Sequence, residues 1–189
     1  EVTCENKGKP IGSFEVKVVR NESGEPADID EDGEIWVRGY TVMLGYYKNE
    51  EATREAITPE GWFRTGDLGH YDKDGYLKIT GRAKEMFIVG GSNAYPAEIE
   101  RYLETHRKVG QAVVCGAPHE RLGEVCFAFV MPKAGEQLTE GEIVEYCRGQ
   151  IADYKVPRHV DVVEDFPRTT TNKIQRFILQ KEIADRFSG

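Results

Sequence analysis

The hydrophobic pattern of this chain changes near Gly81, and that change constrains the fold more than any other feature. Before it, short segments alternate apolar and polar residues, which is typical of strands with one buried face. These segments lie at 14–20, 34–38, 62–71 and 76–81. After Gly81, strands alternate with helices. We therefore predict an α+β fold in two parts: a β-rich segment over 1–81 and a compact α+β domain over 82–189.

The second part carries clear helix starts. Pro96 stands where a first helical turn would begin, and Glu98 places an acid near the positive end of the helix dipole. Thr139 and Glu142 have the spacing of a capping box. The predicted elements are strands at 86–89, 111–115, 126–131 and 159–163, a helix from Pro96 with the buried stripe Ile99, Leu103 and His106, a helix from Thr139 with the apolar face Ile143, Cys147 and Ile151, and a last helix over 174–187.

The composition limits the classes of function. With a formal charge of −8 and no basic run, the chain lacks the cations that a nucleic-acid partner requires. No apolar run approaches the roughly 18–20 residues of a membrane-spanning helix, and no signal peptide is visible. The four cysteines, Cys4, Cys115, Cys126 and Cys147, show no paired spacing, so we expect reduced, mostly buried thiols. These features predict a cytoplasmic protein.

Two segments imitate metal motifs without completing them. Residues 28–33 have the acid spacing that opens an EF-hand calcium loop, but Gly39 stands at the twelfth position, where a bidentate Glu is needed. His119 and Glu120 begin a zinc-helix pattern that lacks its second histidine. No nucleophile elbow of the Gly-x-Ser-x-Gly type occurs. We therefore predict a turn at 28–33 and no metal site in this chain.

A carboxylate and a guanidinium mark the open end of a predicted hairpin. Asp67 lies on its first strand and Arg82 follows its second, while residues 72–75 have the composition of a tight turn with Gly75 at the position of positive φ. A carboxylate acceptor beside a fixed cationic donor suits the two hydroxyls of a ribose. On the residues alone, a turn-capping aspartate and a solvated arginine are commoner roles.

Several ordered segments resemble the motifs of one family. They are 33–39 with Gly45-Tyr46-Tyr47 and Ala52-Thr53, then 62–67, then 81–84 through 98–100, and finally 157–173, which closes in Pro167-Arg168-Thr169-Thr170-Thr171-Asn172-Lys173. One segment alone would be weak, but four in this order and spacing are specific. The sequence resembles the C-terminal third of the adenylate-forming (AMP-dependent) acyl-CoA synthetases and ligases. That resemblance implies the β-rich tail of a large N-terminal domain followed by a small, mobile C-terminal lid domain.

The resemblance also implies roles for individual residues. Asp67 and Arg82 are expected to bind the ribose of ATP or AMP. Lys84 is expected at the hinge about which the lid rotates, and Gly91 is expected to line the tunnel that admits the pantetheine arm of coenzyme A. Lys173 is expected to be catalytic, because an ammonium placed there would stabilise charge on the α-phosphate and align the acyl oxygen.

Each of these assignments has a plainer alternative. Lys84 and Lys173 have the alternative of ordinary exposed lysines, and Gly91 that of a strand-terminating turn. The chain departs from the family pattern at Asn172, where the family usually has glycine. Because asparagine also tolerates the left-handed conformation, we expect the loop before Lys173 to keep its shape.

The activity implied for the parent protein is that of an ATP-dependent acid–thiol ligase. It would convert a carboxylic acid to acyl-AMP and transfer the acyl group to coenzyme A, with Mg²⁺ held by ligands outside this chain. The segment 93–98 favours a fatty acid. The family's phosphate loop is missing from the sequence, so we expect the isolated chain to be inactive and to require its parent's N-terminal region. Two alternatives stay open: an adenylation domain that loads a carrier protein, and a non-catalytic binding module that associates with a partner or itself through an exposed interface.

Overall fold

The computed structural model of the chain describes residues 7–20 and 24–187. The chain divides into two compact units, Glu1–Lys84 and Glu85–Gly189. The first is built on a five-stranded antiparallel sheet, and the second on a mixed sheet covered by helices. The α+β class predicted from the sequence is confirmed. The identity of the two parts, as the tail of a larger domain and a mobile lid, stays a prediction.

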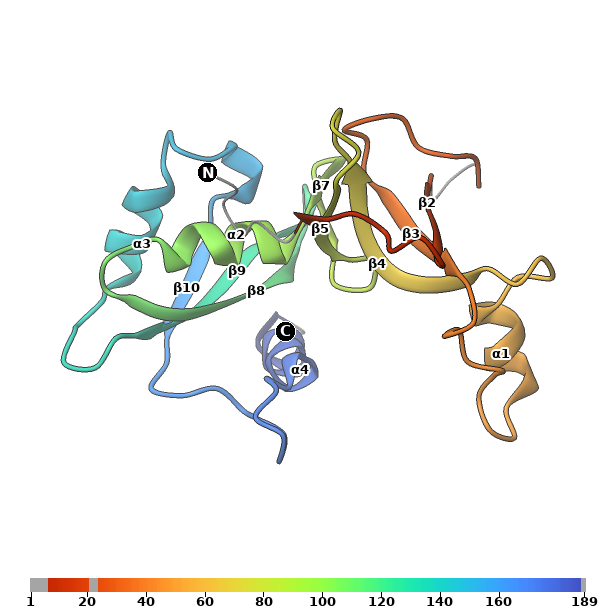
Figure 1. Ribbon diagram of the computed structural model, residues 1–189. Coiled ribbons are helices and arrows are strands. Elements are labelled where there is room, and N and C mark those ends of the chain that lie inside the picture. Colours follow the sequence, from red (N-terminus) through yellow and green to blue (C-terminus); the bar gives the residue numbers. More distant parts are fainter. Residues whose placement is uncertain (1–6, 21–23, 188–189) are drawn as a thin grey trace. The chain divides into compact units, whose positions relative to one another are not determined.

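The sheet of the first unit has the strand order β1-β5-β4-β3-β2 (Figure 1). Its strands are β1 (Lys7–Gly8), β2 (Glu15–Val19), β3 (Gly33–Arg38), β4 (Phe63–Tyr71) and β5 (Leu77–Arg82). These strands bury Val18, Val19, Ile35 and Leu68. The register shifts between Leu68 and Gly69 where β4 pairs with β5. A β-bulge of this kind re-aims the neighbouring side chains.

The one helix of the first unit's described residues is α1 (Glu50–Ala56). The Asn49 side chain accepts a hydrogen bond from the Ala52 N–H, and Glu50 and Glu51 lie in the first turn. These features stabilise a helix start.

The sheet of the second unit centres on two long strands, β8 (Val109–His119) and β9 (Gly123–Pro132), which pair antiparallel over nearly their full length. β9 also pairs in parallel with β10 (His159–Val162) and at one position with β6 (Phe87–Val89), and β6 forms a hairpin with β7 (Ser92–Ala94). β8 pairs with β9 on one side only, so its other side is an edge of the sheet. Both long strands extend beyond their predicted bounds. Gly116, Pro118 and Gly123 interrupt the apolar pattern from which the bounds were predicted, but the pairing of β8 with β9 continues through these residues.

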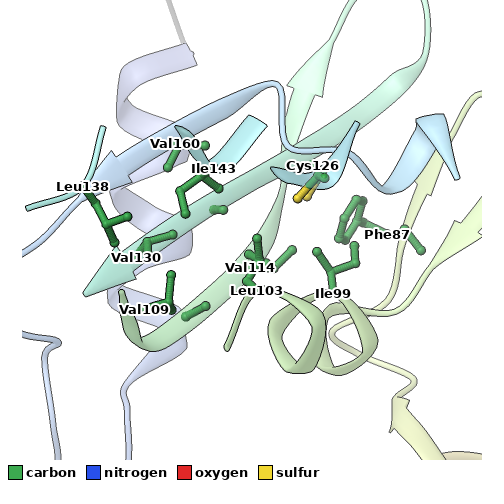
Figure 2. Close-up of a cluster of buried hydrophobic side chains, with 14 of the residues drawn as sticks. Phe87, Ile99, Leu103, Val109, Val114, Cys126, Val130, Leu138, Ile143 and Val160 are labelled. Carbon is green, nitrogen blue, oxygen red and sulfur yellow. The ribbon is translucent and has the colours of Figure 1, made fainter. Parts of the chain in front are cut away.

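Helices cover both faces of this sheet (Figure 1). α2 (Pro96–Glu104) and α3 (Glu140–Cys147) pack on one face, and α4 (Arg176–Phe187) packs on the other. A short 3₁₀ turn, η1 (Asp153–Lys155), precedes β10. Figure 2 shows the cluster on the first face, where Ile99 and Leu103 of α2 meet Val114 of β8. Because both faces of the sheet are buried, the sequences of β8 and β9 are nearly continuous apolar runs and do not alternate between apolar and polar residues.

Two predicted helix faces extend too far. α2 ends at Glu104, so His106 lies beyond the helix. α3 ends at Cys147, so Ile151 packs against the same cluster from the following loop. The predicted capping box of α3 is present, with Thr139 and Glu142 bonded reciprocally, and Pro96 begins α2 as expected. In the part of the chain that the structure describes, no helix is long and apolar enough to cross a membrane.

Candidate functional site

Asp67 and Arg82 are cross-strand neighbours at the open end of the β4–β5 hairpin. The register pairs them directly, and Arg82 Nε lies 2.7 Å from Asp67 Oδ1. The turn of the hairpin has the predicted form, with Gly75 at φ 73°. The structure thus brings together the acid and the base that the sequence placed at the end of this hairpin. Their use as ribose ligands stays a prediction.

The backbone before Asp67 is fixed by side chains of two strands. Thr65 Oγ1 donates to the Ile35 carbonyl at 2.7 Å and accepts from the Asp67 N–H at 3.0 Å. The Gly66 N–H donates to Glu34 Oε1 at 3.1 Å, and Gly66 has φ 72°, where glycine is favoured. The holding role of Glu34 could not be read from the sequence, because it depends on how β3 and β4 align.

This arrangement can bind a vicinal diol. One oxygen of Asp67 faces Arg82, and an ionised carboxylate has about four lone-pair sites, so it can accept further hydrogen bonds. The Arg82 side chain is 58% exposed, which leaves guanidinium donors open to a ligand. A hairpin with a fixed bulge keeps both groups in place.

Lys84 lies in the turn that connects β5 to β6, and its side chain is exposed. The first compact unit ends at this residue. A junction between two compact units, in a segment outside helices and strands, is where backbone dihedrals can change without disturbing a core. Motion at Lys84 itself stays a prediction.

Gly90 and Gly91 form the turn of the β6–β7 hairpin, with φ of 56° and 88°. The Gly90 N–H donates to the Leu122 carbonyl at 2.9 Å. A Cβ on Gly90 would lie 3.1 Å from Leu122 Cδ2, whereas a Cβ on Gly91 would meet no described atom within 4 Å. The space that a Gly91 side chain would occupy is therefore free of described protein atoms, which is compatible with the predicted tunnel for the pantetheine arm.

The segment before Lys173 forms a tight turn closed by a bridge between Arg168 and Ile174. The Thr169 N–H donates to the Lys173 carbonyl at 2.8 Å, and the Lys173 N–H donates to Thr169 Oγ1 at 3.1 Å. Asn172 has φ 66°, so asparagine adopts here the left-handed conformation that this residue type tolerates, as expected from the sequence. The turn holds Lys173 by its backbone, while its side chain is exposed.

A basic cavity in the second unit was not predicted from the sequence. Its volume is about 690 Å³, and it is lined in part by His119, Arg148, Arg158 and His159. A second cavity of about 300 Å³ is lined in part by Gly90 and Ser92, and it shares Asp153, Val156 and Arg158 with the first. Arg148 follows α3 and Arg158 directly precedes β10, so no run of basic residues in the sequence signals this cavity. Such a cavity suits a ligand with phosphate groups.

The structure contains no candidate metal centre among its described residues: no group of three or more His, Cys, Asp or Glu side chains is placed to hold an ion. In the predicted turn at 28–33, acids are engaged by other side chains. Arg20 pairs with Asp28 and Glu31, and Asp32 contacts His70. The EF-hand imitation is therefore a turn held by ion pairs.

Three cysteines are free and buried: Cys115, Cys126 and Cys147. Cys4 lies outside the described residues. Burial raises the pKa of the Cys115 thiol to about 12 and that of Cys147 to about 11, and burial also raises the pKa of Cys126. Because the thiolate is the reactive form, these side chains act as apolar core groups rather than nucleophiles.

We expect the three buried thiols of a Cys4→Ser variant to resist a thiol reagent at pH 8 in the native state and to react in denaturant. For Cys115, a pKa of about 12 in place of 9.0 alone slows the reaction about 10³-fold. The native state binds these protons more tightly than the unfolded chain, so the free energy of unfolding falls as pH rises from 9.0 toward 12. Fast native-state labelling at pH 8 would contradict this burial.

Comparison with known proteins identifies relatives of this chain. Residues 98–173 match the family model of the AMP-binding enzyme C-terminal domain. The mitochondrial medium-chain acyl-CoA ligase ACSF2 of Danio rerio is 47% identical over 167 residues, which is 88% of this chain and 28% of that protein. The chain thus spans under a third of that relative.

Solved structures show the same fold. ATP-bound MatB from Rhodopseudomonas palustris has a TM-score of 0.88 at 34% identity, covering 95% of this chain and 36% of that one. The o-succinylbenzoate CoA synthetase MenE from Bacillus subtilis, solved with its acyl-adenylate intermediate, has a TM-score of 0.84 at 37% identity, covering 92% of this chain and 35% of that one. The chain belongs to the adenylate-forming acyl-CoA synthetase family and carries a C-terminal portion of it.

Proposed function

We propose that this chain supplies the ribose contact and the mobile lid of an ATP-dependent acid–thiol ligase. The parent enzyme joins a carboxylic acid to AMP and then passes the acyl group to coenzyme A. The observation that carries the proposal is the paired Asp67 and Arg82 on a rigid hairpin, in a chain of this family. Asp67 accepts hydrogen bonds from the ribose hydroxyls, and Arg82 donates beside them.

Lys173 serves the first half-reaction. An oxygen of the substrate carboxylate attacks the α-phosphorus of ATP, the bond to the bridging oxygen breaks, and pyrophosphate leaves. The phosphoryl oxygens share negative charge in the transition state, which a nearby ammonium stabilises. The rigid turn at 168–174 and the exposed side chain support this role, because the ammonium projects from a fixed backbone.

Gly91 serves the second half-reaction, in which the sulfur of coenzyme A bonds to the acyl carbon, the carbon–oxygen bond to AMP breaks, and the thiol proton passes to solvent. The open space above Gly91 supports a passage for the pantetheine arm. The two neighbouring cavities, which reach from Gly90 to Arg148, Arg158 and two histidines, offer cations to the phosphates of coenzyme A.

Lys84 is the hinge between the two half-reactions. In this proposal 1–81 is the tail of the large N-terminal domain and 82–189 is the lid, which presents Lys173 in one orientation and Gly91 in the other. The division of the structure after Lys84 supports a hinge there. Mg²⁺ neutralises the triphosphate through ligands outside this chain.

The substrate we propose is a fatty acid. The segment 93–98 favours it, and the relative from Danio rerio is named a medium-chain acyl-CoA ligase. That relative is also mitochondrial, so the cytoplasmic location predicted from the sequence stays a prediction beside it. An adenylation domain that loads a carrier protein remains the second candidate, and a non-catalytic module associating with a partner or with itself is the third.

The test uses a polypeptide of the relatives' length that contains this chain. With ATP and Mg²⁺, we expect straight-chain fatty acids to form acyl-CoA, while a panel of aromatic and dicarboxylic acids reacts at least about tenfold more slowly. Coenzyme A and a phosphopantetheine-bearing carrier protein serve as competing acceptors. Acylation of the carrier alone would favour the second candidate, and no adenylate with any acid would favour the third. The isolated chain, assayed in parallel, is expected to release no pyrophosphate.

A further inference from the structure

A mostly buried ion pair joins two helices that cover opposite faces of the second unit's sheet. Arg176, the first residue of α4, reaches Glu100 of α2 with Nη1–Oε1 at 2.6 Å and Nη2–Oε2 at 2.7 Å. The side chains are 25% and 11% exposed. A parallel, two-bond contact of this kind fixes the relative orientation of both groups.

This pair also bonds the N–H and the carbonyl of one residue at the sheet edge, Val114. Glu100 Oε1 accepts from the Val114 N–H at 2.7 Å, and Arg176 Nη1 donates to the Val114 carbonyl at 3.4 Å. Val114 lies on β8, which pairs with β9 on one side only. The two side chains therefore take the place of a neighbouring strand, and they anchor the start of α4 to one position along β8.

Arg176 follows Lys173 by a single short segment, so its anchor also holds one end of the Lys173 turn. The other end is held by Arg168, whose Nη2 donates to Gln111 Oε1 at 2.6 Å and whose Nη1 donates to the Asn172 carbonyl at 3.3 Å. Gln111, like Val114, belongs to β8. The turn is thus tied to one rigid strand from both sides.

A second carboxylate links this anchor to the start of the unit. Glu85 Oε2 lies 3.5 Å from Arg176 Nε, and Glu85 directly follows Lys84. One guanidinium therefore contacts the segment after the junction, α2 and the edge of β8. Buried ion pairs are seldom the most stable choice for a core, because well-packed apolar groups do as well or better. A role in positioning explains better why charge is buried here.

We propose that Glu100 and Arg176, with Arg168 and Gln111 on the other side, are positioning residues that hold the Lys173 turn in register with β8. We call these contacts the clamp. Glu85, the residue after Lys84, belongs to it through Arg176, so the Lys173 turn moves as one body with the segment that follows Lys84. The inference rests on the proposed function, in which the Lys173 ammonium must meet the α-phosphate. A displacement of about 1 Å at a reacting group can slow a reaction about 10²-fold.

The first experiment needs no activity and uses this chain as it is. In Glu100→Gln, which keeps the shape and an acceptor for Val114 but removes the charge, we expect the amides of Thr169, Asn172 and Lys173 to exchange with solvent at least about tenfold faster. Amides of the β8–β9 ladder should keep their protection. Arg186→Ala is the matched control, because it breaks another arginine–carboxylate pair of α4, that with Asp161 at 2.9 Å.

The second experiment measures the two half-reactions in a polypeptide of the relatives' length that contains this chain. Glu100→Gln is expected to lower kcat for ATP–pyrophosphate exchange about 10–10²-fold with little change in the KM for ATP. Thioester formation from supplied acyl-AMP should stay near the level of Arg186→Ala. A purely structural role would instead lower both half-reactions with the amount of folded protein.

Three outcomes decide the inference. Unchanged turn amides and unchanged exchange kinetics in Glu100→Gln overturn it. If Glu100→Gln unfolds the chain, Gln111→Ala decides, since it removes only the Arg168 side: faster turn amides support the clamp, and unchanged ones overturn it. If Lys173→Ala itself leaves pyrophosphate exchange intact, the catalytic role of Lys173 fails, and the amide exchange still decides whether the clamp exists.

Discussion

Replacing Lys173 by alanine is expected to slow ATP–pyrophosphate exchange about 10²–10³-fold while thioester formation from supplied acyl-AMP stays within about twofold. The physical reason is that the α-phosphorus is attacked, and passes through a phosphoryl-transfer transition state, only during adenylate formation. In the second half-reaction the thiol attacks the acyl carbon, and the α-phosphorus keeps the same four oxygens throughout. Both rates are measured in a polypeptide of the relatives' length that contains this chain.

Two variants calibrate this result. Lys181→Ala removes another exposed lysine of the same unit, from α4, and should leave both half-reactions unchanged. Lys173→Arg keeps the charge but moves it, so we expect partial recovery of the exchange rate. Exchange that persists in Lys173→Ala would show that another group stabilises the phosphoryl transfer. Loss of both half-reactions together would instead indicate a damaged fold.

The local elements of the fold could be predicted because their signals are short in sequence. The hairpin of β4 and β5 and the capping box of α3 each depend on residues that lie close together in the sequence. The ends of β8 and β9 could not be placed in this way. Glycine and proline interrupt their apolar pattern, yet pairing between the strands continues through those residues. β7 was missed because Ser92-Asn93-Ala94 has no strand pattern of its own and pairs only through its turn with β6.

The candidate site divides along the same line. Asp67 and Arg82 could be paired from the sequence because one hairpin connects them, and the turn before Lys173 could be anticipated from Asn172. The side chains that hold these site residues in place could not be predicted from the sequence. Glu34 holds Gly66 across a strand pair, and Arg176 reaches Glu100 across 76 positions of sequence. Contacts of this kind depend on register and packing, which no local pattern encodes. The basic cavity was missed for the same reason.

Gly91 gives the second large effect, on the other half-reaction. In Gly91→Leu we expect thioester formation from supplied acyl-AMP to fall about 10²-fold, while ATP–pyrophosphate exchange stays within about threefold of the wild-type rate. A Cβ at Gly91 meets no described atom within 4 Å, so the first atom of the new side chain has room in the protein itself. It would then occupy the space that the proposal gives to the pantetheine arm.

The backbone at Gly91 has φ 88°, so a side chain there carries a conformational cost of about 1–2 kcal/mol whatever its role. Gly135→Leu is the matched control, because Gly135 has φ 81°, also has open space around it, and lies in the turn after β9. Equal thermal stability of the two variants, with loss of thioester formation in Gly91→Leu alone, separates blockage from strain. Equal loss in both variants would mean that backbone strain explains the effect, and Gly91 would then be a turn glycine. Retention of thioester formation in both would remove the passage from the proposed mechanism and leave Lys173 as the lid's one contribution to the chemistry.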